Sequence, residues 1–250
     1  MGSQDGFSQL INLYISYFNI INFDATCIIK VVNDIFIERV RLCNSLEENT
    51  KLEKGKDNYK DLNGLVVFPD EIDKNFYILI KHARVNENLD FAKTLCHEFT
   101  HVIDFADYMK HYSLTTLRME PNIEDYNSYE ILSEFKARYR SFVIYFHLVD
   151  FPHVLESYDI LCDDYFKLIK DRINKKDYGR CLYFLSQFLG QYEAINMYFK
   201  LQLPLPKFIY NLNLESLCKK IMEVTDEESL FNKTIEVINE VEKRFKSEYL

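Results

Sequence analysis

The stretch FAKTLCHEFTHVIDFADY, residues 91–108, decides how the rest of the chain is interpreted. It places His97 and His101 four residues apart, with Glu98 directly after the first histidine, in a chain that has only six histidines. On a helix, side chains four residues apart lie on one face, with Cβ atoms about 6 Å apart. Apolar residues recur at helical spacing through this stretch, so we expect a buried helix that begins near residue 89 and ends near residue 108.

Two imidazoles on adjacent turns of one helix can both point a nitrogen at a zinc ion, at about 2.1 Å. Glu98 follows His97 by about 100° around the helix, which places its carboxylate beside the metal rather than on it. There it can take a proton from a water that attacks a carbonyl carbon, and pass that proton to the leaving amine. Uncharged histidines on a buried helix need polar partners. We therefore predict Zn²⁺ held by His97 and His101, with Glu98 as the general base.

Residues 97–101, His-Glu-Phe-Thr-His, are the HExxH motif, and residues 91–108 resemble the active-site helix of the zincin metallopeptidases. A looser resemblance extends over about residues 64–140. It implies a fold in which a sheet edge, the motif helix and a later helix supply the site, and a third ligand that comes from downstream. Asp104 stands where the metzincin pattern has glycine, and no histidine follows at the required place. The resemblance therefore implies a gluzincin-type ligand, a glutamate on a later helix.

The segment YEILSEFKARYRS, residues 129–141, offers two such glutamates, Glu130 and Glu134. EFKAR is similar to the ExxA pattern of short intracellular and phage-associated zincins, including the ImmA/IrrE-like group. That resemblance implies Glu134 as the zinc ligand and Ala137 as a small residue that lets two helices approach. A thermolysin-like pattern needs an acid at 138, where Arg138 stands. The alternative keeps Glu130 as the ligand, with Glu134 behind it.

Further residues are predicted to surround the metal. Asp104 lies one turn after His101 and either accepts a ring N–H from a zinc-bound histidine or is a solvated or helix-capping carboxylate; both interpretations are open. With Glu134 as ligand, Glu130 is left as a neighbour of the site. Tyr129 and Arg138 flank the ligand and are candidates for stabilising an oxyanion, as is Tyr126.

Composition sets the class of protein. The chain has 250 residues, 48% hydrophobic and 28% charged, which is enough for a full globular core. A net charge of −9 argues against nucleic-acid binding by general electrostatics. The six cysteines form no CxxC pair and are read as reduced thiols. We expect a cytoplasmic protein, because no basic leader precedes an apolar segment and no apolar run is long enough to span a membrane. Secretion without a leader is the open alternative.

The fold class we expect is α+β and mainly helical, with a small sheet. Two short runs read as strands, Leu65–Phe68 and Phe76–Ile80, separated by a turn-rich connector. A polar stretch over residues 47–64 is predicted to be a loop or linker. Apolar periodicity predicts helices over residues 7–22, 24–46 (with Asp24 as N-cap), 126–149, 152–174, 177–201, 213–223 and 226–247. Residues 1–150 are expected to form the metallopeptidase core, and residues 151–250 a helical region packed on it.

The expected partner is a peptide or protein substrate. The segment NFYILIK, residues 75–81, is predicted to be the edge strand to which an extended peptide is added. An alternative function is a zinc-containing regulatory or protein-binding module with little hydrolase activity, and a third is a helical interaction protein without metal. Glu98 favours the peptidase, because a purely structural zinc site has no need of a base.

Overall fold

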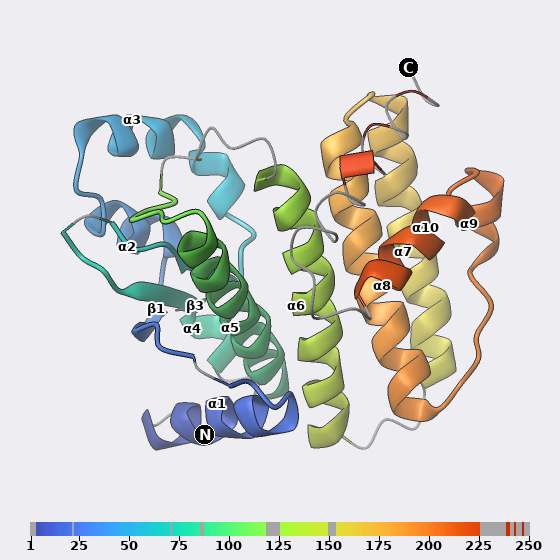
Figure 1. Cartoon of the computed structure of the whole chain (residues 1–250), viewed down its shortest axis with the longest axis horizontal. Coiled ribbons are helices and arrows are strands. Elements are labelled where there is room, and N and C mark those ends of the chain that lie inside the picture. Colours follow the sequence, from blue (N-terminus) through green and yellow to red (C-terminus); the bar gives the residue numbers. More distant parts are fainter. Residues whose placement is uncertain are drawn as a thin grey trace. The chain divides into compact units, whose positions relative to one another are not determined.

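The chain folds into two compact units, Met1–Pro121 and Asn122–Leu250 (Figure 1). This computed structural model describes residues 4–21, 23–70, 72–85, 88–118, 126–149, 154–225, 239–240, 243 and 247. Most of the predicted last helix, residues 226–247, lies outside the described residues. The division falls after residue 121, whereas residues 1–150 were predicted to form one core.

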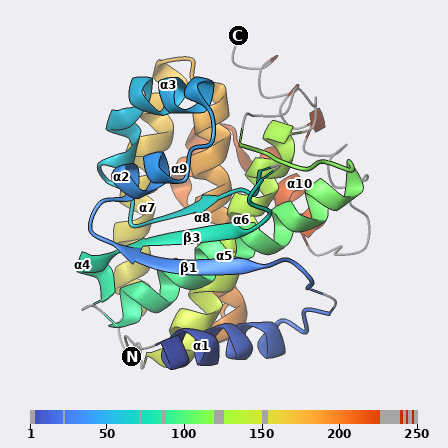
Figure 2. The same cartoon turned by 90° about the vertical axis from the view of Figure 1, so that its left-hand side faces the viewer.

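The first unit holds a three-stranded sheet and most of the short helices. In chain order its elements are α1 (Gln4–Tyr17), β1 (Cys27–Val32), α2 (Ile35–Arg41), α3 (Leu46–Lys54), η1 (Lys56–Tyr59), β2 (Gly64–Val67), β3 (Phe76–Lys81), α4 (His82–Val85) and α5 (Asn88–His111). The strand order is β1-β3-β2, with β1 parallel and β2 antiparallel to β3. Figure 2 shows the three strands side by side with α5 running across the sheet. The expectation of a mainly helical α+β fold is confirmed.

The central strand is β3, which corrects its prediction as the edge strand. Its residues Phe76–Ile80 are all buried. Tyr77 and Leu79 pack in one apolar cluster with Ile35 of α2, while Phe76 packs on the ring of Phe68 on the other face. Because successive side chains point to opposite faces, a strand covered on both sides has to be apolar throughout. The continuous apolar run was therefore a sign of a central strand, and the edges belong to β1 and β2.

The predicted helix over residues 24–46 is wrong. Residues Cys27–Val32 form β1, and only Ile35–Arg41 form a helix, α2, whose N-cap is Asp34 rather than Asp24. The spacing of the apolar residues fitted a helix, but four of six residues in CIIKVV are β-branched, which favours a strand. The partner of β1 is β3, whose register places Cys27 opposite Phe76.

Residues 47–64 do not form the predicted loop, because helix α3 and the turn η1 occupy most of them. The Ser45 hydroxyl accepts a hydrogen bond from the backbone N–H of Glu48, at 3.1 Å. Serine followed three residues later by glutamate is the pattern of a helix capping box. The sequence SLEE, residues 45–48, therefore carried a helix-start signal that the polar composition of the segment masked.

The second unit is a helical bundle. Its elements are α6 (Tyr126–Leu148), α7 (Val154–Asn174), α8 (Tyr178–Phe199), α9 (Lys207–Asn211) and α10 (Glu215–Thr225). The predicted helices over residues 126–149, 152–174, 177–201 and 213–223 are confirmed with small shifts at their ends. Helix α8 packs against both α6 and α7. None of the described helices is long and apolar enough to cross a membrane.

A buried ionic network links distant segments of the first unit. The Arg118 side chain is 3% exposed and lies 2.8 Å from the carboxylate of Asp70. It also donates to the backbone carbonyls of Phe68, at 2.6 Å, and of Leu42. Glu48 of α3 lies 3.9 Å from the Arg118 guanidinium and also pairs with Arg39. The segment after α5 is thereby fixed to α3 and to the connector between β2 and β3.

We predict that Arg118→Met destabilises the protein by about 3–5 kcal/mol, because Asp70 keeps a partly buried charge that has lost its partner. Urea unfolding followed by circular dichroism measures the loss. Arg41→Met is the matched control: the Arg41 side chain is 70% exposed and pairs with Glu38 on the surface. It is expected to cost about 0–1 kcal/mol. Equal losses in the two variants would contradict the structural role of Arg118.

Candidate metal centre

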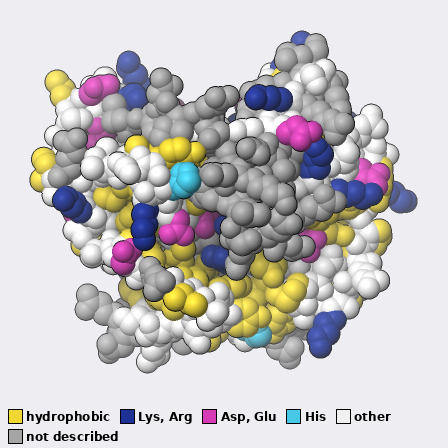
Figure 3. All heavy atoms as spheres, viewed as in Figure 1, with side chains coloured by type: hydrophobic (Ala, Val, Ile, Leu, Met, Phe, Trp, Pro, Cys, Tyr) yellow, Lys and Arg dark blue, Asp and Glu magenta, His cyan; other side chains and the backbone are white. Residues whose placement is uncertain are grey.

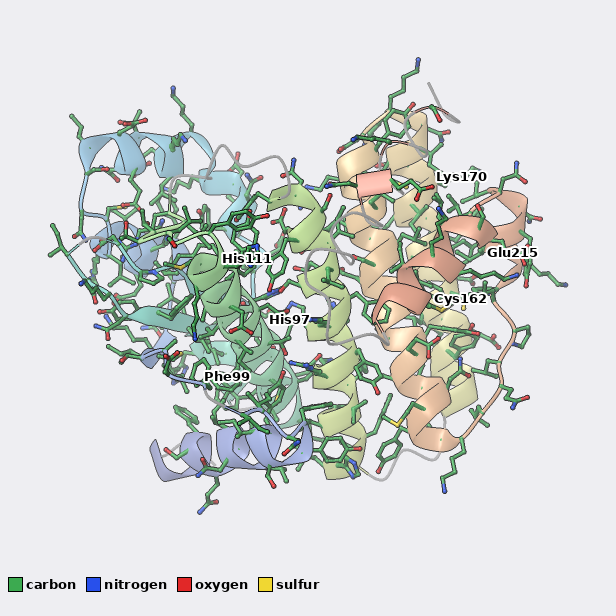
Figure 4. All side chains as sticks on the ribbon, viewed as in Figure 1. His97, Phe99, His111, Cys162, Lys170 and Glu215 are labelled. Carbon is green, nitrogen blue, oxygen red and sulfur yellow. The ribbon has the colours of Figure 1, made fainter. Side chains whose placement is uncertain are left out.

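The predicted motif helix is confirmed as α5, which is buried over most of its length. Phe99 packs edge-on against the ring of Tyr14 from α1, with ring centroids 5.5 Å apart, and against Phe23. In Figure 4, Phe99 lies on the side of α5 nearer α1, while His97 projects from the other side. The apolar face of α5 therefore fixes the direction in which the motif histidines point.

A hydrogen bond between α1 and α5 holds the motif in place. The Thr100 hydroxyl donates to the carbonyl of Cys96 in the preceding turn, at 2.8 Å. The Tyr14 hydroxyl then donates to the same Thr100 oxygen, at 2.6 Å. Both hydroxyls are fully buried, so each satisfies a polar group that would otherwise be costly in the core. The second variable position of the HExxH motif is thus a structural contact.

The two histidine rings of the motif converge. The Nε2 atoms of His97 and His101 are 3.2 Å apart, and the ring planes are nearly perpendicular, at 88°. Two nitrogens held at about 2.1 Å from a tetrahedral ion lie about 3.4 Å apart. The observed separation fits that requirement. It also fits a hydrogen bond from one neutral ring to the other, so the third ligand decides between the two interpretations.

Glu134 of α6 completes a group that can hold a metal ion. One ligand atom from each of His97, His101 and Glu134 lies within 4.8 Å of the others. Among the described residues, no other group of three or more histidine, cysteine or acidic side chains has its ligand atoms so close together. Two histidines and one glutamate are a ligand set found at catalytic zinc sites, where a fourth position is left for water or substrate. The donor set therefore fits a zinc ion.

Hydrogen bonds from other helices of the second unit position Glu134. The side-chain N–H of Gln187, on α8, donates to Oε2 of Glu134 at 2.8 Å. Tyr165, on α7, donates in turn to the amide oxygen of Gln187, at 3.4 Å. Burial raises the pKa of Tyr183 well above its usual value, and the charge of Glu134 and a hydrogen bond to it raise it further. Tyr183 therefore stays protonated and donates to the carboxylate.

Close helix packing brings this support within reach of Glu134. A Cβ atom on Gly190 of α8 would overlap the backbone carbonyl of Phe135 and lie 2.9 Å from the Cβ of Arg138. The approach of α8 to α6 therefore requires glycine at this position. Ala137, the small residue that the family resemblance implied, is completely buried on α6. Helix α8, which carries no recognisable chemical motif, thus supports the candidate ligand.

The remaining predicted site residues are placed as follows. Glu98 is buried, at 9% exposed, and so is Asp104, at 4%, which argues against a solvated Asp104. Glu130 is exposed and does not belong to the metal-binding group. Tyr129 is buried. The positive charge of Arg138 lowers the pKa of the Tyr165 and Tyr183 hydroxyls, but burial raises the pKa of both by more.

The other described histidines and cysteines do not belong to the metal-binding group. His111 is in the last turn of α5, about 15 Å along the helix from His101, and His82 is exposed on α4. Cys96 is fully buried, and burial raises the pKa of its thiol. All six cysteines are free thiols. A cavity of about 180 Å³ in the first unit has Lys56, Lys60 and Lys81 in its lining, but none of the predicted site residues.

Comparison with known proteins gives no family assignment: no family model, curated protein or solved structure matches the chain. The assignment of the site therefore depends on its own geometry.

Sequence reasoning missed Gln187, Tyr165 and Tyr183. A signal was present for one of them, because Gln187 is a polar residue inside the apolar run CLYFLSQFLG, residues 181–190. A polar side chain at such a position needs a buried hydrogen-bond partner. What the sequence does not contain is the identity of that partner, which lies 53 residues earlier.

We predict that Gln187→Met lowers the affinity for Zn²⁺ by about 10–100-fold, because loss of a residue that orients a ligand has effects of this size. Competition with a chromophoric chelator measures the affinity. Gln191→Met is the matched control, since Gln191 lies one turn further along α8 and is partly exposed. Unchanged affinity in Gln187→Met would show that the amide does not position Glu134.

Proposed function

We propose that this protein is a zinc-dependent metallopeptidase in which His97, His101 and Glu134 bind the metal and Glu98 is the general base. The observation that carries the proposal is that ligand atoms of His97, His101 and Glu134 lie within 4.8 Å of one another, the two histidines being on the helix that also presents Glu98. When bound, zinc supplies Lewis-acid chemistry: it polarises a carbonyl and lowers the pKa of water towards 7. The resemblance of residues 91–108 to the zincin active-site helix supports the same function.

Each of the four site residues has a distinct role in this proposal. His97 and His101 offer Nε2 atoms from adjacent turns, and Glu134 offers an oxygen from α6 whose direction Gln187 and Tyr183 set. Glu98 takes a proton from the attacking water and delivers it to the leaving amine nitrogen. The low exposure of Glu98 limits competition from bulk water for that proton.

The substrate proposed is an extended peptide that pairs with the edge strand β2. Because β3 is central, β2 is the strand of the hairpin that has its outer edge free of another described strand. β2 and β3 both contact α5, and Gly64 at the start of β2 lies beside Glu98. Strand addition there would lead a peptide backbone past the proposed base.

Surface charge gives little preference for one sign of substrate. On the face seen in Figure 3, the coloured Lys and Arg side chains are interspersed with Asp and Glu. The net charge of −9 favours basic or neutral peptides only weakly, because exposed charges are screened over about 10 Å.

A second candidate function is a zinc-containing protein-binding module with little hydrolase activity. The observation in its favour is that Glu134 is embedded in the helical bundle through Gln187 and Tyr183. A metal bound there would stabilise the bundle whether or not a water is activated. The role of Glu98 distinguishes the two functions, because a protein-binding module does not require a general base.

We predict about one zinc per chain in protein purified without chelator, measured by elemental analysis. Glu98→Gln is expected to retain that zinc and to lose peptide cleavage by about 10²–10⁴-fold, the usual contribution of general-base catalysis. Cleavage of a peptide library, read by mass spectrometry, provides the assay. Glu53→Gln is the matched control, because Glu53 is an exposed glutamate on α3.

The outcomes distinguish the candidates. Zinc with no cleavage by the wild-type protein supports the binding module. Absence of zinc, together with no uptake of added Zn²⁺, refutes both and leaves His97 and His101 as a hydrogen-bonded pair. Cleavage that persists in Glu98→Gln contradicts the assignment of the base.

A further inference from the structure

The first residue of the edge strand, Gly64, lies directly against the side chain of Glu98. A Cβ atom at Gly64 would be 2.8 Å from both Cγ and Oε1 of Glu98. It would also be 2.7 Å from Cγ2 of Thr94, one turn earlier on α5. Carbon atoms in van der Waals contact are about 3.5–4.0 Å apart. Only a residue without a side chain therefore fits at this position as Glu98 now lies.

The backbone conformation does not explain the glycine. No described glycine has a positive φ angle, so an L-amino acid could adopt the backbone of Gly64. Gly64 is paired with Ile80 in the ladder between β2 and β3. Glycine within a strand weakens it and often marks a site of close approach. Here the close approach is to the carboxylate of the proposed base.

We propose that Gly64 is a positioning residue for Glu98: its missing side chain gives the carboxylate room, and its backbone limits how far that carboxylate can turn towards the sheet. This inference rests on the proposed function, because it concerns the base of that reaction. Gly64 does not itself touch the reacting atoms. The carboxylate is the flexible end of its side chain, so a Cβ atom at Gly64 displaces Glu98 more easily than it displaces the strand or α5.

The kinetic test is Gly64→Ala. A displacement of about 1 Å at a catalytic group can cost about 10²-fold in rate, so we expect kcat to fall by about 10–100-fold. Zinc content and KM are expected to stay the same, because the contacts of Gly64 involve Glu98 and Thr94 and not the three ligands. A wild-type kcat in Gly64→Ala would overturn the inference, and so would a loss of activity caused by loss of zinc.

Gly179→Ala is the matched control. Gly179 lies in the first turn of α8, and a Cβ atom there would meet nothing within 4 Å. Alanine in an open helical position stabilises a protein by restricting the unfolded chain. Gly179→Ala is therefore expected to raise Tm and to leave kcat unchanged, whereas Gly64→Ala is expected to lower both.

A thermal-unfolding cycle tests the contact without any assay of activity. In a Glu98→Ala background, Cγ and Oε1 of Glu98 are gone, so Gly64→Ala should lower Tm by less than it does in the wild type. The third background is Thr94→Ser, which removes the other close atom, Cγ2. There too, Gly64→Ala should lower Tm by less than it does in the wild type. The same drop in Tm in all three backgrounds would overturn the inference. If Gly64→Ala does not fold alone, the comparison is made within the Thr94→Ser background.

The two readouts separate failure of the inference from failure of the proposed function. A wild-type protein that cleaves no peptide, combined with a positive unfolding cycle, refutes the peptidase and retains the contact between Gly64 and Glu98. Normal cleavage by Gly64→Ala refutes the positioning role and retains the peptidase.

Discussion

The structure depends on the burial of polar side chains along α5. Glu98, Thr100, His101 and Asp104 lie within two turns of one helix and are all buried. Each buried polar group costs free energy unless it finds a partner. Thr100 is satisfied by Tyr14 and by the carbonyl of Cys96. The two histidines converge with Glu134 on a position suited to a cation, which would compensate the remaining cost. A core helix with this much polar content is difficult to explain by packing alone.

The same constraint acts on the helical bundle. Glu134 is a buried carboxylate in the middle of α6, where an uncompensated charge would be expensive. Gln187 and Tyr183 reduce that cost with hydrogen bonds, and Gly190 allows α8 to approach closely enough for them to form. The residue types at these three positions of α8 are thus explained by its packing against α6 and Glu134. This explains how α7 and α8, which carry no chemical motif of their own, still contribute to the candidate site.

The sequence predicted the local features and missed the long-range ones. The motif helix and α6 were predictable from apolar residues at helical spacing, and β2 and β3 from short runs of β-branched and aromatic residues. In β1, the spacing of Ile28, Val31 and Val32 fitted a helix as well as a strand. The strand forms because it pairs with β3, each residue of β1 lying opposite the residue 49 positions later in the chain. The place of β3 in the sheet was misjudged, although its apolar run indicated burial on both faces. Glu134 was favoured over Glu130 by pattern, and the structure adds that Glu130 is exposed.

The proposed base and the candidate third ligand are supported by different parts of the chain, which would separate two properties of the candidate site. Glu98 is set by the edge strand through Gly64, whereas Glu134 is set by α7 and α8 through Gln187. We therefore expect a change near the strand to act on proton transfer and to leave the ligand atoms in place. We expect a change in the bundle to act on metal affinity and to leave Glu98 in place. Because kcat and zinc affinity can be measured independently, their separate response to substitutions in the two regions is the property that a buried histidine pair without a metal would not show.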